Sequence, residues 1–251
     1  MPPSTFPFGP VKCSSVNIAE FLDEIQVLLK DRTEQPRTIS CVNAHIFNLA
    51  WNDTKLAEYL NCFRIVTVDG MSIVWAARLL GVPIQERCNM TEAFRAFLQD
   101  SSFPSTTAIL LGDTEETARL AAEKINASSK HTKVLSYLSG YLDDEDYVAY
   151  LRQKEEIDFL FLGMGTPKSE RLVSVLSGIL PNTIVWHIGG GTIQILAEHL
   201  VEAPLWMRRS GLQWVHRLFM QPGKMWKRYL IGNVLFLWRY LALAIGNNRG
   251  R

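Results

Sequence analysis

Several features are missing from this sequence of 251 residues, and each missing feature excludes a class of protein. It has only four cysteines, and no two of them have the C-x-x-C spacing of a zinc site or a redox motif. No secretory signal peptide is visible, so reduced thiols in a cytoplasmic protein are the simplest interpretation. No cluster of His, Asp and Glu suggests a metal site, and no G-x-S-x-G motif suggests a hydrolase nucleophile.

Long hydrophobic runs are also missing. No uninterrupted apolar run reaches the roughly 18–20 residues of a transmembrane helix. The nearest run, residues 230–245, has 16 residues and is interrupted by Asn233 and Arg239. The sequence therefore predicts no membrane span.

Acidic residues are absent from the C-terminal part of the chain. Residues 203–251 contain nine Lys and Arg but no Asp or Glu, whereas the other 202 residues have a net charge of about −8. Four of the seven tryptophans also lie in this stretch. Such a split indicates a neutral or acidic catalytic body and a basic tail for an anionic partner. We predict an N-terminal arm and first helix in residues 1–35, loose at its Pro-rich start, a catalytic domain in 36–202, and a C-terminal appendage in 203–251.

What the sequence does contain is a regular alternation of strand-like and helix-like segments. Hydrophobic residues make up 47% of the chain, so a sizeable core can be buried. Apolar runs predict strands at 38–42, 64–68, 106–112, 133–138, 157–165 and 183–191, each followed by a helical pattern. Six such units predict an α/β fold: a Rossmann-like, doubly wound, mostly parallel sheet with a basic, aromatic-rich helical appendage. A TIM barrel would need eight units.

Polar residues and glycines follow these strands, at the sheet edge where α/β proteins bind ligands. They are Asn43, Asp69-Gly70, Gly112-Asp113, Gly163-Met164-Gly165 and Gly189-Gly190-Gly191. Glycines there let a phosphate approach backbone N–H groups, which indicates a nucleotide or another phosphate ligand, although each glycine can equally serve a tight turn. The spacing matches neither G-x-G-x-x-G nor a P-loop, so a nicotinamide-dependent oxidoreductase is a weak alternative.

Asp69 stands where the hydrophobic run IVTV gives way to a helical pattern. Two interpretations are open. The carboxylate can shape the turn or cap the next helix. It can also be a general base that deprotonates a hydroxyl nucleophile. Spacing alone does not decide between them.

Several motifs, taken together and in order, resemble the WecG/TagA/CpsF glycosyltransferases, also known as glycosyltransferase family 26. The segments are CVNAHIFNLA, VDGMSIVWAARLLG, QERCNMTEAF, FLFLGMGTPKSE, WHIGGGTIQILAE and EAPLWMRRSGLQWVHRLFMQPGKMWKRYL. They cover about residues 36–230, most of the chain. No single motif is specific, but their number and their order make the resemblance strong.

The resemblance implies an inverting, metal-independent hexosyltransferase without a cofactor. Such an enzyme moves a sugar from a UDP-sugar to a polyprenyl-diphosphate-linked sugar at the cytoplasmic face of the plasma membrane. The product enters a bacterial cell-surface polysaccharide, of the exopolysaccharide, capsule or teichoic acid type. We expect the appendage to contact the anionic membrane surface, expect no nucleic acid as a partner, and leave a homo-oligomer open.

The resemblance also assigns residues. Asp69 matches the proposed base of the family. The substrate-binding positions that it implies are Cys41, Asn43, Gly70, Arg87, Gly112, Gly163, Gly165, Pro167, Lys168, Glu170, Gly189, Gly190, Arg217, Lys224, Lys227 and Arg228. Of these, the four basic residues of the appendage would balance the charge of the UDP leaving group and of the acceptor diphosphate.

The sequence departs from the family pattern at positions that bear on sugar specificity more than on reaction class. Cys41 stands where the family has Thr, Met90 where it has Gly, and Glu202 where it has Arg. Ser169 replaces a Gln, and Lys224 replaces an Arg, which keeps the charge but loses bidentate geometry. Two further glutamates are replaced by Gln213 and Gln221.

These departures support a second hypothesis, a catalytically silent nucleotide-sugar-binding regulator or scaffold at the membrane. In it, Cys41 and Ser169 mark lost catalysis. The presence of Asp69 and Arg87 argues against it.

Overall fold

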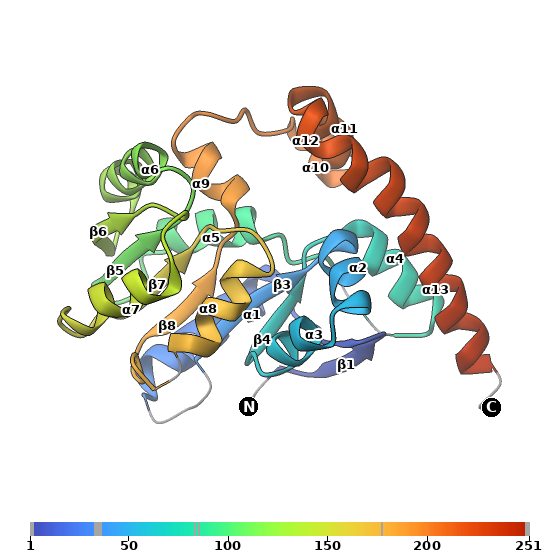
Figure 1. Cartoon of the computed structure of the whole chain (residues 1–251), viewed down its shortest axis with the longest axis horizontal. Helices are drawn as coiled ribbons and strands as arrows, with labels where there is room; N and C mark the ends of the chain where they lie inside the picture. Colours follow the sequence, from blue (N-terminus) through green and yellow to red (C-terminus); the bar gives the residue numbers. More distant parts are fainter. Residues whose placement is uncertain (1–2, 33–36, 83, 85, 177, 249–251) are drawn as a thin grey trace.

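The computed structural model describes residues 3–32, 37–82, 84, 86–176 and 178–248, without the side chains of Lys224 and residues 246–248. Its centre is a six-stranded sheet of the order β4-β3-β8-β7-β5-β6, in which every pairing is parallel. The strands are β3 (Thr38–Val42), β4 (Ile65–Val68), β5 (Thr106–Leu111), β6 (Thr132–Leu138), β7 (Phe159–Leu162) and β8 (Ile184–His187). The predicted Rossmann-like α/β fold is therefore confirmed (Figure 1).

Helices cover both faces of the sheet. They are α1 (Ile18–Lys30), α2 (Ala44–Asn52), α3 (Thr54–Asn61), α4 (Met71–Leu79), α5 (Met90–Gln99), α6 (Glu115–Ser128), α7 (Asp144–Arg152), α8 (Lys168–Leu176) and α9 (Gly190–Leu196). Side chains of β5 alternate between two hydrophobic cores, with Ala108 and Leu110 in one and Ile109 and Leu111 in the other. Because successive strand residues point to opposite faces, this alternation shows a doubly wound sheet.

An aromatic cluster fills the larger core. Trp186 of β8 is fully buried, and its ring lies edge-on to Phe21 of α1 and to Phe94 and Phe97 of α5, with ring centroids 5.3 Å apart in each pair. Such edge-to-face pairs add roughly 0.5–1.5 kcal/mol each beyond the area that they bury. The cluster ties α1 and α5 to the centre of the sheet.

The N-terminal residues do not form the loose arm that their proline content predicts. Strands β1 (Thr5–Phe8) and β2 (Val11–Ser14) form an antiparallel hairpin. The apolar residues Phe6, Phe8, Val11 and Cys13 alternate along it and are buried. The hydroxyl of Ser14 accepts a hydrogen bond from the backbone N–H of Val66, 3.2 Å away, at the edge of the main sheet. The burial of every second side chain, which is typical of a strand, therefore decides the structure here in spite of the prolines.

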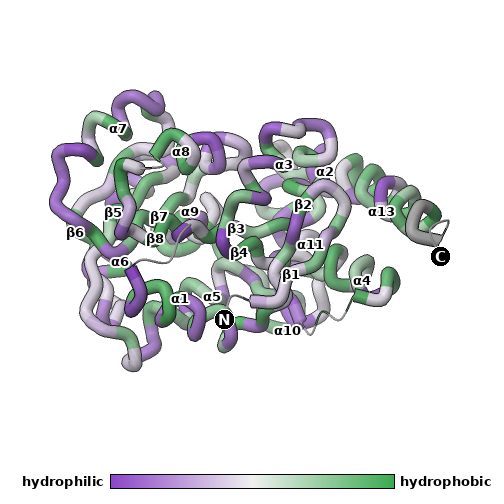
Figure 2. The backbone as a smooth tube through the Cα atoms, turned by 90° about the horizontal axis from the view of Figure 1, so that it is seen from below, coloured by the Kyte–Doolittle hydropathy of each residue, from purple (hydrophilic) through white to green (hydrophobic). Residues whose placement is uncertain are grey.

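The C-terminal appendage is built from helices joined by short turns. It contains α10 (Leu205–Arg209), α11 (Gln213–Met220), α12 (Pro222–Trp226), the π-helical turn η1 (Lys227–Ile231) and α13 (Gly232–Asn248). In Figure 1, α13 is the long red helix that extends past α2 and α4. In Figure 2, which looks from below, α13 and α4 lie at the same end of the molecule and are mostly hydrophobic.

The helix at residues 227–245 is longer than the apolar run seen in the sequence. By length and composition, Lys227–Ile245 could cross a membrane, contrary to the expectation from uninterrupted runs. One such helix is weak evidence for a span. In this structure Arg239 is 5% exposed and fastens α13 to α2, since its guanidinium donates to the Asn48 carbonyl (2.7 Å) and to Asn52 Oδ1 (2.6 Å). The guanidinium that interrupts the run is therefore hydrogen-bonded to the protein through its two terminal nitrogens.

Candidate active site

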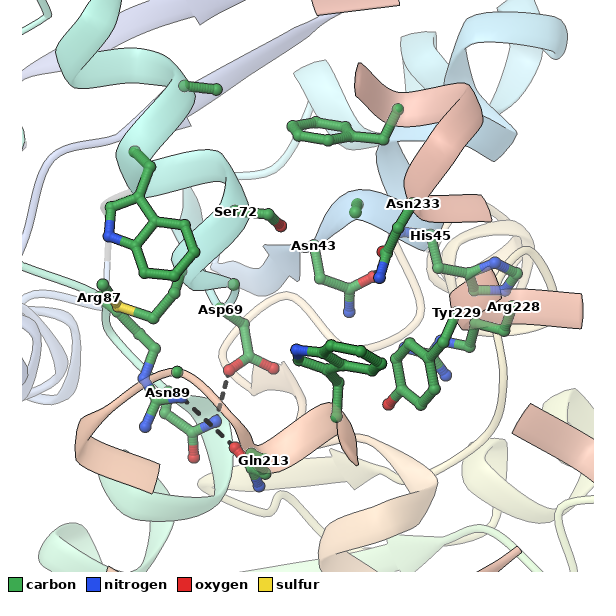
Figure 3. A pocket seen from close by; sticks show the side chains of 18 of the residues that line it. Asn43, His45, Asp69, Ser72, Arg87, Asn89, Gln213, Arg228, Tyr229 and Asn233 are labelled. Atoms are coloured by element: carbon green, nitrogen blue, oxygen red, sulfur yellow. Dashed lines mark hydrogen bonds between the residues drawn. The ribbon is translucent and has the colours of Figure 1, made fainter. Parts of the chain in front are cut away.

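A cavity of about 470 Å³ opens at the carboxyl ends of β3 and β4. One wall comes from the main domain, at the N-termini of α2, α4 and α5, and the other wall comes from α11, η1 and α13 of the appendage. Figure 3 shows Asp69 between these walls, with Asn89, Arg87 and Gln213 on one side and Arg228 and Tyr229 on the other. The cavity lies at the sheet edge where an open α/β fold binds its ligands.

Asp69 directly follows β4 and faces the cavity. Its backbone N–H donates to the carbonyl of Val42 (2.9 Å), which continues the β3–β4 ladder by one residue. Its carboxylate accepts a hydrogen bond of 2.6 Å from Asn89 Nδ2. Burial raises the pKa of Asp69 to about 6, against the opposing effects of Arg87, Arg217 and the Asn89 hydrogen bond. A carboxylate with such a pKa is ionised at neutral pH and still basic enough to accept a proton.

Asn89 has two roles that the motif reading missed. It is the N-cap of α5, because its Oδ1 accepts from the backbone N–H of Glu92 at 3.0 Å. Its Nδ2 donates to Asp69 at the same time. The signal was present as Asn before MTEAF, an N-cap before a helical pattern, but sequence analysis predicted no helix there. The helix cap thus orients the carboxylate.

The N-termini of α2 and α4 also face the cavity. Asn43 caps α2 and accepts from the backbone N–H groups of His45 (3.0 Å) and Ile46 (3.1 Å). Gly70 is the N-cap of α4, and a Cβ placed on it would lie 3.5 Å from Asn43 Cβ. Helix N-termini carry a partial positive charge, so their convergence favours an anionic ligand.

Three arginines line the cavity, and their environments differ. Arg87 is held by Glu92 (3.3 Å) and by Gln213 of the appendage (3.4 Å). Arg217 lies so close to Gly191 that a side chain there would collide with its guanidinium. The Nε of Arg228 is buried without a hydrogen-bond partner among the described residues. Neither Arg217 nor Arg228 forms an ion pair with a carboxylate of the described residues. Both guanidinium groups can therefore bind an anionic ligand.

Further cavity residues add a neutral and aromatic surface. Burial and the nearby Arg228 lower the pKa of His45 to about 4, so this imidazole is neutral at physiological pH. The rings of Trp214 and Tyr229 lie 5.9 Å apart, on α11 and η1. Both line the cavity from the appendage side.

Other predicted site residues lie along the edge formed by β5, β7 and β8, outside the cavity lining. Gly112, Gly163 and Gly190 serve close packing, because a Cβ on Gly163 would collide with Ile193 and one on Gly112 or Gly190 would collide with the backbone of Gly163. Gly189 has a φ of 85° and is the N-cap of α9. A Cβ added to Gly165 or to Gly189 would have no neighbouring atom within 4 Å. Open space therefore remains beside these two glycines.

Four predicted residues have structural partners. The ammonium of Lys168 donates to the carbonyls of Gly140 (3.0 Å) and Leu142 (2.6 Å). Glu170 is fully buried, 3.4 Å from His187 Nδ1, and accepts from the Thr166 hydroxyl at 3.0 Å. Pro167 follows Thr166 through a cis peptide bond. Cys41 is buried in β3, and burial raises the pKa of its thiol far above the ordinary value.

The remaining two basic residues lie in the appendage. Lys227 is exposed, with its ammonium 5.4 Å from the centre of the Trp226 ring. Lys224 belongs to α12, but its side chain lies outside the described residues. The cavity itself therefore gathers Asn43, Asp69, Gly70, Arg87, Arg217 and Arg228 from the predicted set.

A chain of ion pairs joins the appendage to the main domain. Glu92 contacts both Arg87 (3.3 Å) and Arg208 (3.2 Å), and Glu202 contacts Arg208 (3.1 Å) and Arg95 (2.8 Å). Glu202 stands where the family pattern has Arg, and here it bridges two arginines. The appendage is thus held over the cavity by charges that are mostly withdrawn from solvent.

Within the described residues, no three His, Cys, Asp or Glu side chains come together as potential metal ligands. A partly buried carboxylate with a raised pKa shares the cavity with Arg217 and Arg228, which have no carboxylate partner among the described residues, and this arrangement suits an anionic substrate. The chain belongs to the glycosyl transferase WecG/TagA/CpsF family, whose family model matches residues 7–250. The resemblance read from the motifs, and the assignment to a glycosyltransferase family, are confirmed.

Curated relatives match over most of their length. One from Bacillus subtilis (strain 168) is 26% identical over 215 residues, 85% of this chain and 82% of the relative. One from Staphylococcus aureus (strain MW2) is 24% identical over 87% of this chain and 84% of the relative. One from Bacillus spizizenii is 20% identical over 90% and 87%. All three are named N-acetylglucosaminyldiphosphoundecaprenol N-acetyl-beta-D-mannosaminyltransferase.

Proposed function

We propose that this protein transfers a hexosyl group from a UDP-sugar to a polyprenyl-diphosphate-linked sugar, by inversion and without a metal ion or cofactor. The observation that carries the proposal is Asp69, a partly buried carboxylate that accepts a hydrogen bond from Asn89 and shares the cavity with Arg217 and Arg228. The names of the relatives support a lipid-linked sugar diphosphate as acceptor, and N-acetylmannosamine as the first donor sugar to test. The product would enter a cell-surface polysaccharide.

The mechanism we propose is a single displacement. Asp69 removes the proton from an acceptor hydroxyl, and the oxygen attacks the anomeric carbon from the face opposite UDP. The bond between that carbon and the UDP oxygen breaks, and UDP leaves with the electron pair. Arg217 and Arg228, together with the N-termini of α2 and α4, would balance the negative charge of the diphosphates.

We further propose that the enzyme acts as a peripheral protein at the cytoplasmic face of the plasma membrane. Side chains exposed on α13 and η1 include Leu230, Val234, Leu237, Trp238, Leu241 and Ile245, at the spacing of one helical stripe. Lys227 stands at the start of this stripe. An amphipathic helix of this composition suits the interface of an anionic bilayer.

The test is acceptor-dependent release of UDP by the wild-type protein and by Asp69→Asn. Wild type is expected to release UDP from one of a panel of UDP-sugars only when a prenyl-diphosphate-linked sugar is supplied. Asp69→Asn keeps the shape and the hydrogen bond from Asn89, and should lose at least about 100-fold in kcat, in the range of a removed general base. Equal rates would refute the role of Asp69. No release with any donor and a supplied acceptor would favour the regulator.

A further inference from the structure

The cavity at Asp69 has two chemically different ends. Its polar end holds the carboxylate, three arginines and the N-termini of α2 and α4. Its other end is apolar and runs between two helices that are far apart in the sequence. From α4 come Trp75, Ala76 and Leu79, and from α13 come Phe236, Leu237 and Tyr240.

The spacing of these residues makes a groove with two matching walls. On each helix the lining residues stand at positions i, i+1 and i+4, which lie on one helical face. Gly211, before α11, has a φ of 76°, and a Cβ placed on it would lie 3.1 Å from Met71 and 3.4 Å from the Trp75 ring, so the appendage passes close to α4 there. Figure 2 shows α4 and α13 as neighbouring hydrophobic segments at one end of the molecule.

Part of each wall remains exposed to water in this chain, whereas Ala76 and Phe236 are buried. Trp75 is 52% exposed, Leu79 76% and Leu237 56%, although all three line the cavity. Large apolar side chains gathered in a concave site mark a surface that a ligand covers. Among the described residues, no segment of this chain occupies the groove.

The occupant must continue from the polar end, because the two ends form one cavity. A diphosphate held by Arg217 and Arg228 leaves the apolar substituent of that diphosphate at the groove. The groove also borders the exposed stripe of α13, where Leu237 lies between Val234 and Leu241. An apolar chain in the groove therefore has a continuous path from the charged site to the membrane-facing stripe.

We infer that the groove between α4 and α13 binds the first isoprene units of the acceptor lipid. This inference rests on the proposed function and adds a chain-binding subsite to it. The subsite recognises the apolar chain directly, in addition to any effect of the membrane on local concentration. It lets the enzyme distinguish a lipid-linked sugar diphosphate from a free one, such as the nucleotide sugar donor.

The test uses water-soluble acceptors, so that no membrane takes part. One sugar diphosphate is esterified with a methyl, a 10-carbon isoprenyl or a 15-carbon isoprenyl group and is assayed below its micelle concentration. For the wild type, KM should fall by about tenfold or more from the methyl to the 15-carbon acceptor, since burying two methylene-sized groups is worth about that factor. In Leu79→Asn/Leu237→Asn, this dependence on chain length should shrink to threefold or less.

A matched control is Leu135→Asn, which changes a leucine of similar exposure (54%) on β6, at the opposite edge of the sheet. It should keep the full dependence on chain length. The inference is overturned if wild type uses the methyl and 15-carbon acceptors with equal KM, or if the groove variant keeps the wild-type ratio. If either of these results is found while the methyl acceptor still gives product, only the groove inference fails and the proposed function is retained. No product from any acceptor, including a full-length one in detergent, would instead refute the proposed function.

Discussion

At the scale of single residues, the proposed mechanism depends on one carboxylate, Asp69, whose environment raises its pKa. Burial raises the pKa of Asp69, while Arg87, Arg217 and Asn89 limit the rise. A pKa of about 6 places the change of charge just below neutral pH. The ionised carboxylate would therefore predominate at neutral pH and be lost in mild acid.

This environment predicts the pH dependence of the transfer reaction. For the wild type, kcat/KM should rise through an inflection near pH 6, because only ionised Asp69 accepts the proton. Asn89→Ala removes a hydrogen bond to the ionised form, so its inflection should move to higher pH. Thr114→Ala is the control, since it also removes an N-cap, on the distant α6, and should leave the inflection in place. An unmoved inflection in Asn89→Ala would contradict the positioning role.

The same pKa predicts a trade between activity and stability. Because the folded-state pKa of Asp69 lies above its unfolded value of 3.8, the folded protein binds the proton more tightly. The contribution of Asp69 to the stability of the wild type should therefore fall as pH rises from about 4 to 6. Asp69→Asn removes this loss, so its Tm should exceed that of wild type by a few degrees at pH 8. The excess should be smaller at pH 5, and an Asn variant less stable than wild type at pH 8 would contradict the buried charge.

At the scale of elements, the site is completed by an appendage that is remote in sequence. Gln213, Trp214, Arg217, Arg228 and Tyr229 all reach the cavity from residues beyond 203. The main domain supplies Asp69, and the appendage supplies two of the three arginines that line the cavity. Whatever holds the two parts together therefore controls whether the site is assembled.

The ion pairs of Glu92 predict how the appendage can be loosened. Glu92→Gln weakens the contacts to Arg87 and Arg208, whose side chains are only 10% and 15% exposed. We expect kcat/KM to fall by roughly tenfold or more, since misplaced charges stabilise the leaving group poorly. Cleavage by trypsin within the appendage should also become faster. Glu123→Gln, which breaks an exposed pair with Arg119 on α6, should change neither quantity. Unchanged proteolysis in Glu92→Gln would mean that other contacts hold the appendage.

At the scale of the whole molecule, one end carries both the cavity mouth and the exposed stripe of α13. Trp75 and Leu79 on α4 and Val234, Trp238 and Leu241 on α13 are all more than half exposed. Facing a bilayer, this end would bring the cavity mouth to the lipid surface. Arg239, fastened to α2, argues that α13 lies on the protein and not across the membrane.

This arrangement predicts peripheral binding. The protein should float with vesicles that contain anionic lipid, less so at high salt, and alkaline carbonate should release it. Val234→Asn/Trp238→Ser should reduce flotation severalfold, whereas Tyr141→Ser, which changes an aromatic residue 74% exposed on another surface, should not. Protein that resists carbonate extraction would show a spanning helix, and equal flotation of the stripe variant would place the contact elsewhere.

The sequence alone determined the six strands of the main sheet and the position of Asp69, although it did not predict helix α5. Strands buried on both faces read as continuous apolar runs, and a parallel sheet brings their carboxyl ends to one edge, so Asp69 and Asn43 could be placed there without coordinates. The motifs in order were enough to indicate the family. Apolar runs and the order of motifs can both be read from the sequence, because each depends only on residues that are near one another in the chain.

Only the tertiary structure decided which of the predicted residues share the site. Lys168 and Glu170 belong to buried contacts, while Asn89, Trp214 and Tyr229 join the cavity. The N-terminal hairpin and the fastening of Arg239 to α2 likewise depend on partners far along the chain. The physical reason is that a side chain's role is set by what surrounds it, and the packing of α13 against α2 brings together residues more than 100 positions apart. No local pattern encodes that packing.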